Sequence, residues 1–415
     1  MPELDLAELD TPAYVYDLSA VRESHALLRS FLPEPSTLYY SVKANPHPAV
    51  LTCLRQQGCR CEVSSVGELR SALSAGFPAA EILYTAPAKR DEDVRFAVAS
   101  GIREFSADSP RALDQLDVIA REHGARLRVL LRVNAKSPVP GVGLPMTGVP
   151  SPFGADADWI DGSPEEFIGR DHIELTGLHL YLATNVGHED NLVEQFEIAI
   201  RAAVRAQERL GFPLRVLDLG GGFGAPYAHV GELPRFPAMA SRVEALLDEH
   251  FPRWRRGTPR IAFESGRYLT ATCGRLVTRA LEVKWSQGKR VVVFESGINH
   301  LGGMSGLRRV PAIAPDLVAG DSVDDAAHED AAAVGPLCTP LDSWTRAAAL
   351  PDFQPGDVAV VPNVGAYGLS ASLALFLSHP MPAEVITDGG RMLESSRLSV
   401  TREHLGVPMT AGDHR

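Results

Sequence analysis

Short runs of β-branched, aromatic and aliphatic residues alternate along this chain with longer segments in which apolar residues recur every three or four positions. The clearest periodic segment starts at Leu192, continues through Phe196 and Ala199 at helical spacing, and ends before Gly211 and Pro213. This pattern predicts an amphipathic helix with a defined stop. The short runs predict strands. We expect strands at residues 37–42, 60–64, 81–85, 103–106, 127–133, 174–182, 215–219 and 260–263.

These predicted strands alternate with predicted helices over about 230 residues, which is typical of a (β/α)8 barrel. An open doubly wound sheet is the alternative α/β architecture, but the strand count of eight and the regular alternation favour the barrel. After residue 267 the helical period is lost, which predicts a second, mostly β domain. Further strand-like runs lie at 13–16, 276–285, 290–295, 357–361 and 383–386. We expect the barrel over residues 25–268 and the β domain over 1–24 plus 269–415.

Two long segments show neither the helical period nor the strand pattern. Residues 138–158 contain five prolines and four glycines and follow the fifth predicted barrel strand, on the side where a barrel keeps its active site. Residues 316–333, from Asp316 to Ala333, are acidic and alanine-rich. We expect the second segment to be an exposed loop or a locally ordered excursion.

Composition excludes several classes of protein. The net charge of −12 argues against nucleic acid or an anionic membrane as the general partner. No apolar run approaches the ~18 residues of a membrane span, and the N-terminal residues lack the basic and apolar regions of a signal peptide. The five cysteines are odd in number and lack disulfide-like spacing, which favours a reducing cytoplasm. Cys59 and Cys61 stand too close for the usual zinc pairs, so we expect no metal site.

The carboxyl ends of the predicted barrel strands carry a concentration of polar residues, and these ends form the active-site rim of such a barrel. Lys43 follows the first strand, where an ammonium is costly unless it is paired or its pKa is lowered. Desolvated lysines form Schiff bases with carbonyl cofactors; the alternative is a lysine that extends into solvent. The other strand ends supply Glu62, Lys89, Arg132, Asn134, His179, Tyr181, Thr184 and Glu264.

A glycine run, Gly220-Gly221-Gly222, follows the seventh predicted strand, and Gly266 and Arg267 follow the eighth. Glycine N–H groups can close on a phosphate, and barrel phosphate sites commonly use these two loops. Tight barrel turns also need glycine, which is the alternative explanation. A lysine, a phosphate cradle and a carboxylate that faces a pyridine nitrogen are what a pyridoxal phosphate decarboxylase requires. The alternative for Glu264 is a structural carboxylate bonded to backbone.

The chain resembles the fold-type III pyridoxal phosphate decarboxylases, the group of diaminopimelate, ornithine and arginine decarboxylases, from Thr11 to about Ile386. The motifs that carry the resemblance begin at Tyr40, Val66, Gly177, Leu217, Glu264, Gly335 and Gly365. The resemblance implies an N-terminal barrel of the alanine racemase type and a C-terminal β domain. It also implies a homodimer whose two active sites are shared across the interface.

The resemblance assigns roles residue by residue. Lys43 matches the lysine that binds the cofactor covalently, and Glu264 matches the partner of its ring nitrogen. Cys338 matches a residue from the other subunit that protonates Cα, a task suited to a thiol; its alternative is a small buried hydrophobe. The matches to the phosphate shell are Gly220, Gly221, Gly222, Gly266, Arg267 and Tyr367. Further cofactor contacts are expected from Arg132, Tyr181 and Thr184, and substrate contacts from His179, Arg308, Arg309, Thr339 and Tyr367.

Three departures from the family pattern bear on the substrate. Tyr181 stands where the family usually has a ring-stacking histidine, and its aromatic face can still cover the ring. Ala183 and Thr184 replace a glycine and a serine. Thr339 replaces the acid that pairs with the distal ammonium of the substrate in the diamine-forming members.

The sequences from Gly297 to Leu301, around Arg308 and Arg309, and from Gly335 to Asp342 are similar to a subgroup from siderophore and antibiotic pathways. That subgroup decarboxylates an amino-acid unit already joined to citrate or to a carrier protein. We therefore predict a cytoplasmic, homodimeric pyridoxal phosphate lyase that acts on a conjugated amino acid. The alternatives are diaminopimelate decarboxylase of lysine biosynthesis, a racemase on the same barrel, and a non-catalytic cofactor-binding protein.

Overall fold

The computed structural model describes residues 4–136, 146–302, 313–320 and 328–403. Its N-terminal part is a closed barrel, because β5 pairs with β6 and β2 pairs with β10 to complete a ring of parallel strands. The barrel strands are β2 (Thr37–Ser41), β3 (Arg60–Val63), β4 (Ile82–Tyr84), β5 (Glu104–Ala107), β6 (Leu127–Asn134), β8 (Ile173–His179), β9 (Val216–Asp218) and β10 (Arg260–Ser265). The ring of eight confirms the predicted barrel.

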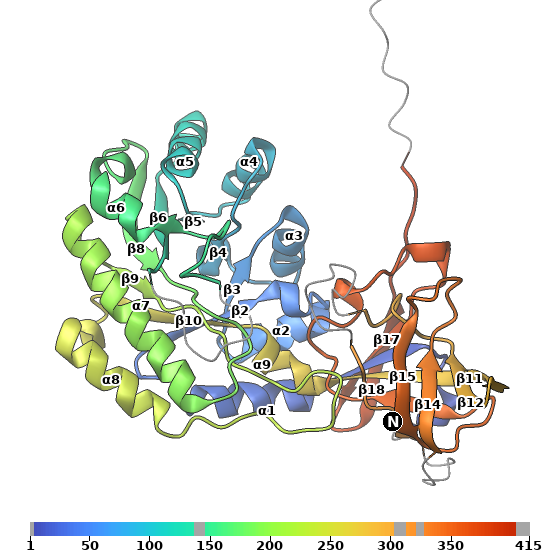
Figure 1. The fold of residues 1–415 in the computed structure, drawn as a ribbon. Helices are drawn as coiled ribbons and strands as arrows, with labels where there is room; N and C mark the ends of the chain where they lie inside the picture. Colours follow the sequence, from blue (N-terminus) through green and yellow to red (C-terminus); the bar gives the residue numbers. More distant parts are fainter. Residues whose placement is uncertain (1–3, 137–145, 303–312, 321–327, 404–415) are drawn as a thin grey trace, which may run out of the picture.

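Helices surround the barrel on its outside (Figure 1). The longest, α7 (Glu189–Leu210), buries its predicted apolar face and ends at Gly211, whose left-handed φ of 65° suits a residue without Cβ. The other helices are α1 (Leu18–Arg29), α2 (Pro48–Gln56), α3 (Val66–Ser74), α4 (Asp91–Ala99), α5 (Pro110–Glu122), α6 (Ala157–Gly162), α8 (Met239–His250) and α9 (Arg267–Thr270).

The barrel interior is packed, so the site must lie above this packing at the carboxyl ends of the strands. The apolar layer consists of Tyr39, Leu83, Leu130, Val216 and Ala262. The Tyr39 hydroxyl donates to Glu104 Oε2 at 3.2 Å. Arg260 donates to Glu104 Oε1 at 3.3 Å, which pairs the buried carboxylate.

The second part of the chain is mostly β, as expected. Its main sheet runs in the order β15 (Ser343–Leu350), β14 (His328–Val334), β12 (Lys289–Phe294), β11 (Gly274–Ser286), β1 (Ala13–Asp17), β17 (Ala383–Asp388) and β18 (Arg391–Arg397). Strand β16 (Val358–Val361) pairs with β11 and with β13 (Val318–Ala319). The N-terminal strand β1 therefore lies between two strands from the second half of the chain, whereas the exact domain boundaries stay a prediction.

Of the two alternatives for residues 316–333, an exposed loop was wrong at both ends, where the chain is locally ordered. The structure has β13 at 318–319 and the start of β14 at 328, and residues 321–327 lie outside the described part. Ala331, Ala332 and Ala333 are buried because β14 lies between β12 and β15. Alanine carries little strand signal, so the sequence pattern did not reveal this central strand.

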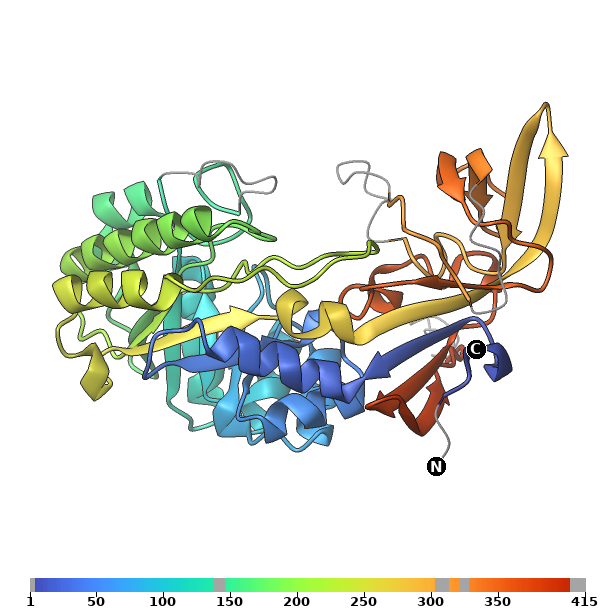
Figure 2. The ribbon, with the colours of Figure 1, turned by 90° about the horizontal axis from the view of Figure 1, so that it is seen from below.

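The two parts lie side by side, and the chain passes from β10 through α9 into the long strand β11 (Figure 2). A loop of the second part reaches the barrel rim beside Lys43. The N–H of Tyr367 donates to Ala44 O at 2.8 Å, and the Asn45 side chain donates to Gly365 O at 2.9 Å. Within the described residues, no helix is long and apolar enough to cross a membrane.

Candidate active site

Lys43 stands in a short 3-10 turn (Val42–Ala44) directly after β2. Its Nζ lies 3.3 Å from Oε2 of Glu62, a buried residue of β3 that also accepts a hydrogen bond from Ser64 Oγ at 3.1 Å. The barrel wall around the amine lowers the pKa of Lys43, but the Glu62 carboxylate outweighs this effect and raises the pKa above its usual value. Since 45% of the Lys43 side chain is exposed, the amine is held in place but stays accessible.

The positive charge of Lys43 at the strand end is balanced by the Glu62 carboxylate. Burial raises the pKa of Glu62, but the Lys43 ammonium and the Thr85 hydroxyl lower it to about 2. The sequence placed Glu62 on the rim without a role, because pairing across neighbouring strands depends on register. The structure supplies that register, with Ser41 of β2 opposite Glu62 of β3.

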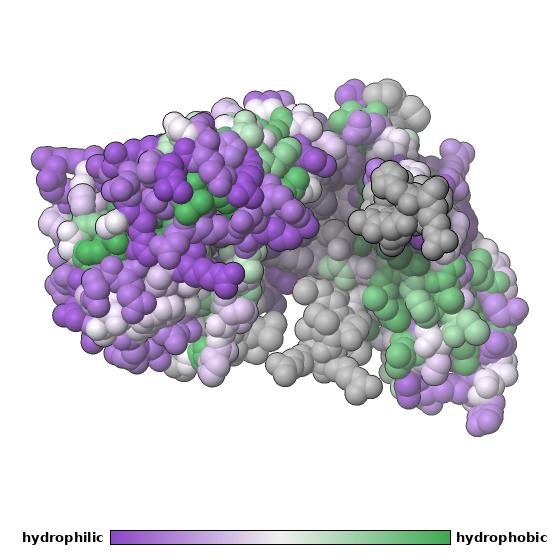
Figure 3. Space-filling model, turned by 90° about the horizontal axis from the view of Figure 1, so that it is seen from above, coloured by the Kyte–Doolittle hydropathy of each residue, from purple (hydrophilic) through white to green (hydrophobic). Residues whose placement is uncertain are grey.

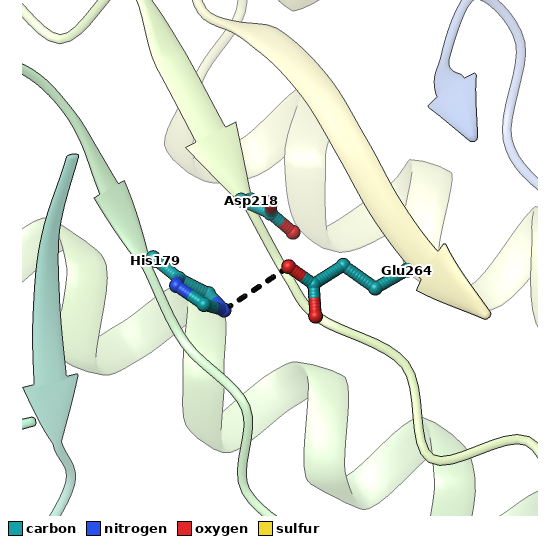
Figure 4. Close-up of side chains that lie close together, drawn as sticks. All are labelled: His179, Asp218 and Glu264. Atoms are coloured by element: carbon teal, nitrogen blue, oxygen red, sulfur yellow. Dashed lines mark ion pairs between the residues drawn. The ribbon is translucent and has the colours of Figure 1, made fainter. Parts of the chain in front are cut away.

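Glu264, His179 and Asp218 form a buried cluster at the ends of β10, β8 and β9 (Figure 4). Nε2 of His179 lies 3.4 Å from Oε1 of Glu264, and neither atom has a hydrogen-bond partner in the described part of the chain. Burial, together with the nearby Asp218 and Glu62 carboxyl groups, raises the pKa of Glu264 well above its usual value. Burial also raises the pKa of Asp218 to about 7.

Such a histidine and carboxylate set could ligate a divalent cation. The same cluster equally provides a buried acid without a partner, which suits a basic ring nitrogen placed opposite it. The Lys43–Glu62 pair beside the cluster favours the second interpretation, because a metal site has no need of a primary amine. The sequence did not single out Asp218, although an acid inside the apolar run that starts at Leu217 was a signal for it.

The glycine run is required by close backbone contacts. A Cβ on Gly221 would lie 1.9 Å from Glu264 O, and a Cβ on Gly222 would lie 2.4 Å from Ala183 O. The N–H of Gly220 donates to Asp218 Oδ1 at 2.9 Å. Within the described residues the N–H groups of Gly221 and Gly222 donate no hydrogen bond, so they are available to an anion.

Arg267 brings a positive charge to the same side of the rim. Its guanidinium lies 4.7 Å from the ring centroid of Tyr367 and 5.5 Å from that of Tyr227. The Tyr227 hydroxyl donates to the backbone carbonyl of Tyr367 at 2.8 Å, which ties the Tyr227 side chain to the segment that carries Tyr367. Arg267 Nε is buried without a hydrogen-bond partner in the described chain. This cation and the free glycine N–H groups together fit a phosphate.

Arg132, Tyr181 and Thr184 lie on the rim as predicted. The Arg132 guanidinium lies 6.0 Å from the Tyr181 ring centroid and 4.6 Å from that of Phe153. Burial raises the pKa of Tyr181, and the Lys43 ammonium and a hydrogen bond with Thr184 oppose this rise. These residues therefore share one electrostatic environment with Lys43.

Lys89 also lies at this rim, but it is engaged by backbone. Its Nζ donates to Ala86 O at 2.9 Å and to Ser106 O at 2.7 Å. Burial lowers the pKa of Lys89 to about 8, and the Arg132 guanidinium adds to this effect although Asp108 opposes it. Lys89 is thus an amine of lowered pKa at the same rim, from which Lys43 must be distinguished by experiment.

Cys338 and Thr339 lie in the loop between β14 and β15, in the second part of the chain. Cys338 is exposed, whereas the other four cysteines are buried. None of the polar contacts recorded for Lys43, Glu264 or Arg267 comes from this loop, so the single described chain does not bring these groups together. Arg308 and Arg309 lie outside the described residues.

Asp342 holds the Cys338 loop in place through hydrogen bonds to backbone N–H groups. Its Oδ1 accepts from Ile298 N at 2.8 Å and its Oδ2 accepts from Leu337 N at 2.7 Å. Asp342 thereby ties together two backbone segments that are far apart in the chain. A Cβ on Gly297 or Gly335 would lie 2.0 Å or 2.3 Å from the carboxylate, so the acid is tightly enclosed.

Known proteins resemble this chain over nearly its whole length. The family model "Pyridoxal-dependent decarboxylase, pyridoxal binding domain" matches residues 18–271. L-glutamyl-[BtrI acyl-carrier protein] decarboxylase of Niallia circulans is 31% identical, covering 93% of this chain and 92% of the relative. 2-[(L-alanin-3-ylcarbamoyl)methyl]-2-hydroxybutanedioate decarboxylase of Staphylococcus aureus is 30% identical, covering 89% and 92%. Diaminopimelate decarboxylase of Methanothermobacter thermautotrophicus is 32% identical, covering 93% and 88%.

Solved structures agree on the fold. Diaminopimelate decarboxylase from M. jannaschii, in complex with L-lysine, superposes with a TM-score of 0.80 at 21% identity and covers 93% of this chain and 89% of that chain. The cofactor of this group fits the residues present, because an accessible lysine, a buried acid without a partner and a free N–H pair beside Arg267 meet at one rim. The chain therefore belongs to the pyridoxal-dependent decarboxylase family and is a pyridoxal phosphate-dependent amino-acid decarboxylase.

Proposed function

We propose that this enzyme removes the α-carboxylate of an amino-acid unit whose distal end is already joined to a small acid or to a carrier protein. The proposal rests on the charges and hydrogen bonds of the Cys338 loop, the segment between β14 and β15. Thr339, next to the thiol, is neutral, and Asp342 is the one carboxylate in the sequence from Gly335 to Asp342. Both Asp342 oxygens accept backbone N–H groups, and the side chain is buried against Gly297 and Gly335, so this acid is enclosed away from a substrate ammonium.

A free diamino acid would place an ammonium beside this loop. A hydrogen bond between an ammonium and a carboxylate contributes roughly 1.5–3 kcal/mol. Asp342 is buried, so it could supply this bond only by moving away from Ile298 and Leu337. A distal amide or ester has no such charge and loses nothing at Thr339.

The relatives support this substrate class. The Niallia circulans enzyme acts on a glutamyl group of an acyl-carrier protein, and the Staphylococcus aureus enzyme acts on an alaninyl carbamoyl conjugate of a hydroxybutanedioate. The second candidate substrate is free diaminopimelate. The Methanothermobacter thermautotrophicus relative, which is 32% identical to this chain, is a diaminopimelate decarboxylase. Of these two substrates, the Cys338 loop favours the conjugated amino acid.

We assign the cofactor contacts as follows. Lys43 would hold the cofactor covalently at its aldehyde carbon, Glu264 would pair with the ring nitrogen, and Tyr181 would pack against the ring. Bound pyridoxal phosphate supplies an electron sink for the electron pair that remains when carbon dioxide leaves. Glu62 holds the Lys43 amine in place through the ion pair. The phosphate is bound by the N–H groups of Gly221 and Gly222, by Gly266, and by Arg267 beside Tyr367.

Cys338 of one subunit completes the site of the other in this proposal. Its exposure on a loop that makes no recorded contact with its own Lys43 supports a role across a homodimer interface. Large apolar side chains of the second part of the chain are exposed as well, including Leu341 at 74%, Leu375 and Phe376. Figure 3 shows apolar residues gathered on that part of the molecule. A second subunit that covers such residues would place Cys338 where it can protonate Cα.

The experiment is a substrate panel with the purified, cofactor-loaded enzyme. Free meso-diaminopimelate, free lysine and amino acids acylated at the distal amine are incubated separately, and mass spectrometry detects the loss of carbon dioxide. We expect rapid loss from the acylated substrates alone. Rapid loss from free meso-diaminopimelate would establish the second candidate, and racemised substrate without carbon dioxide would indicate a racemase.

A further inference from the structure

His179 lies beneath the rim with both ring nitrogens directed at polar side chains. Its Nδ1 lies 3.0 Å from Ser106 Oγ on β5, and its Nε2 lies 3.4 Å from Oε1 of Glu264 (Figure 4). The side chain is 1% exposed, which leaves almost no surface for a substrate atom. The expected role of His179 in substrate binding stays a prediction, and the geometry supports a different one.

We propose that His179 is a positioning residue for Glu264: its Nε2–H donates to Oε1 and holds the carboxylate ionised, with Oε2 left to face the ring nitrogen. The inference rests on the proposed roles of Lys43 and Glu264. It adds a hydrogen-bond donor, His179 Nε2, for the Glu264 oxygen that does not face the ring nitrogen.

The single proton of a neutral imidazole decides whether this bond can form. Burial and the Arg132 guanidinium lower the pKa of His179 well below its usual value, so the ring is neutral and carries one N–H. Ser106 Oγ has no other hydrogen-bond partner in the described chain, so its hydroxyl can donate to Nδ1. The ring proton then lies on Nε2 and faces Glu264.

Glu264 needs such a donor because of its surroundings. Asp218 on β9 and Glu62 on β3 favour the protonated acid, whereas Lys43 and Arg132 favour the carboxylate. A protonated Glu264 would be a poor partner for a protonated ring nitrogen. Oε1 and Nε2 are both buried without any hydrogen-bond partner in the described chain, so each is available to the other. A separation of 3.4 Å is long for a hydrogen bond, and such bonds in free enzymes often shorten when the ligand binds.

The first test reads the tautomer without any cofactor. The apoprotein is prepared with ¹⁵N-labelled histidine, and the His179 resonances are assigned by their loss in His179→Gln. We expect the proton on Nε2 and a non-protonated Nδ1. A proton on Nδ1 would overturn the proposal, because Nε2 would then have nothing to donate.

The second test compares two substitutions in the binding of pyridoxal phosphate to apoprotein without substrate. His179→Leu removes the donor, and His179→Gln places an amide N–H near the position of Nε2. We expect cofactor affinity to fall about tenfold or more in His179→Leu, the size of one charge-assisted hydrogen bond, and to recover in His179→Gln. Unchanged cofactor affinity in His179→Leu, with a raised KM for substrate, would instead show that His179 contacts substrate.

If His179→Leu fails to fold, Ser106→Ala provides a second test. This substitution removes only one hydroxyl group, the one that faces Nδ1 of His179. We expect weaker cofactor binding in this variant and a mixture of both imidazole tautomers. Wild-type affinity together with an unchanged tautomer would contradict the proposal. If the wild-type apoprotein itself binds no pyridoxal phosphate, the proposed roles of Lys43 and Glu264 fail, and that result is distinct from every outcome above.

Discussion

The ammonium of Lys43 and the carboxylate of Glu62 form an ion pair at the mouth of the barrel, with Nζ 3.3 Å from Oε2. Glu62 is buried and keeps a low pKa, so in the absence of cofactor the pair holds Lys43 in its charged form. An amine attacks an aldehyde only after losing its proton. The pair therefore positions Lys43 and also slows its reaction until the proton is removed.

Replacing Glu62 tests this relationship. In Glu62→Gln the carboxylate is lost, so the pKa of Lys43 should fall and more of the amine should be neutral at pH 8. We expect the apoprotein to react several-fold faster with an amine-directed reagent at Lys43, whereas turnover falls about tenfold or more because the amine is no longer oriented. Glu68→Gln is the control, since Glu68 accepts from Ser64 N and, in the described chain, forms no hydrogen bond or ion pair with Lys43. Slower labelling of Lys43 in Glu62→Gln would contradict the account.

Covalent attachment of the cofactor should occur at Lys43. The loaded enzyme is reduced with borohydride, digested and mapped by mass spectrometry. Lys89 is the competing amine, because its pKa is lowered to about 8, although two backbone carbonyls hold its Nζ. We expect the label on Lys43 and loss of the yellow colour in Lys43→Ala. A label on Lys89 or Lys284 would refute the assignment.

Cys338 should act in protonation and should do so in the other subunit. In Cys338→Ala, kcat should fall far more than KM rises, and an aldehyde by-product should accumulate from misplaced protonation. Mixing inactive Lys43→Ala with inactive Cys338→Ala should restore up to about a quarter of wild-type activity, because half of the dimers then contain one intact site. Restoration would fail if each subunit used its own thiol.

Asp218 should make the cofactor-free protein less stable as the pH rises. Its folded pKa of about 7 lies above its usual value, so the folded state binds the proton more tightly than the unfolded state. The stabilising effect of this proton is complete below about pH 4 and is lost as the pH approaches 7. Asp218→Asn keeps the acceptor for Gly220 N and cannot ionise. We expect its apoprotein to exceed the Tm of wild type at pH 8, and by clearly more than at pH 5.

An equal decrease in Tm for Asp218→Asn at both pH values would contradict this explanation. Asp342→Asn is a useful comparison, because both of its oxygens accept backbone N–H groups and one would be replaced by a donor. We expect that variant to lose stability at every pH, by about 1–3 kcal/mol for one unsatisfied buried group.

The sequence predicted the barrel well because each strand and helix has a local signal. The period from Leu192 to Leu210 became α7, and the β-branched run before Lys43 became β2. It failed at β14, whose alanines show no strand preference but are buried between neighbouring strands. The order of the second sheet was not predictable either, because β1 lies between strands that are hundreds of residues away.

The candidate site was predictable as a set of rim residues but not as a set of pairs. Strand-end position brought out Lys43, Glu62, His179 and Glu264. Their pairing depends on the register of neighbouring strands and on side-chain direction, which the sequence does not encode locally. The enclosure of Asp342 by two glycines far apart in the chain is of the same kind.

The most direct test of the substrate proposal compares kcat/KM for Nε-acetyl-lysine and for free lysine, since acetylation removes the charge of the distal nitrogen and joins it to an acyl group. Wild-type enzyme should prefer the acetylated compound by about ten- to a hundredfold, the value of one charge-assisted bond that the neutral Thr339 cannot supply. Thr339→Glu should reverse the preference, whereas the uncharged Thr339→Gln should not. Equal or better decarboxylation of free lysine by the wild-type enzyme would contradict the account.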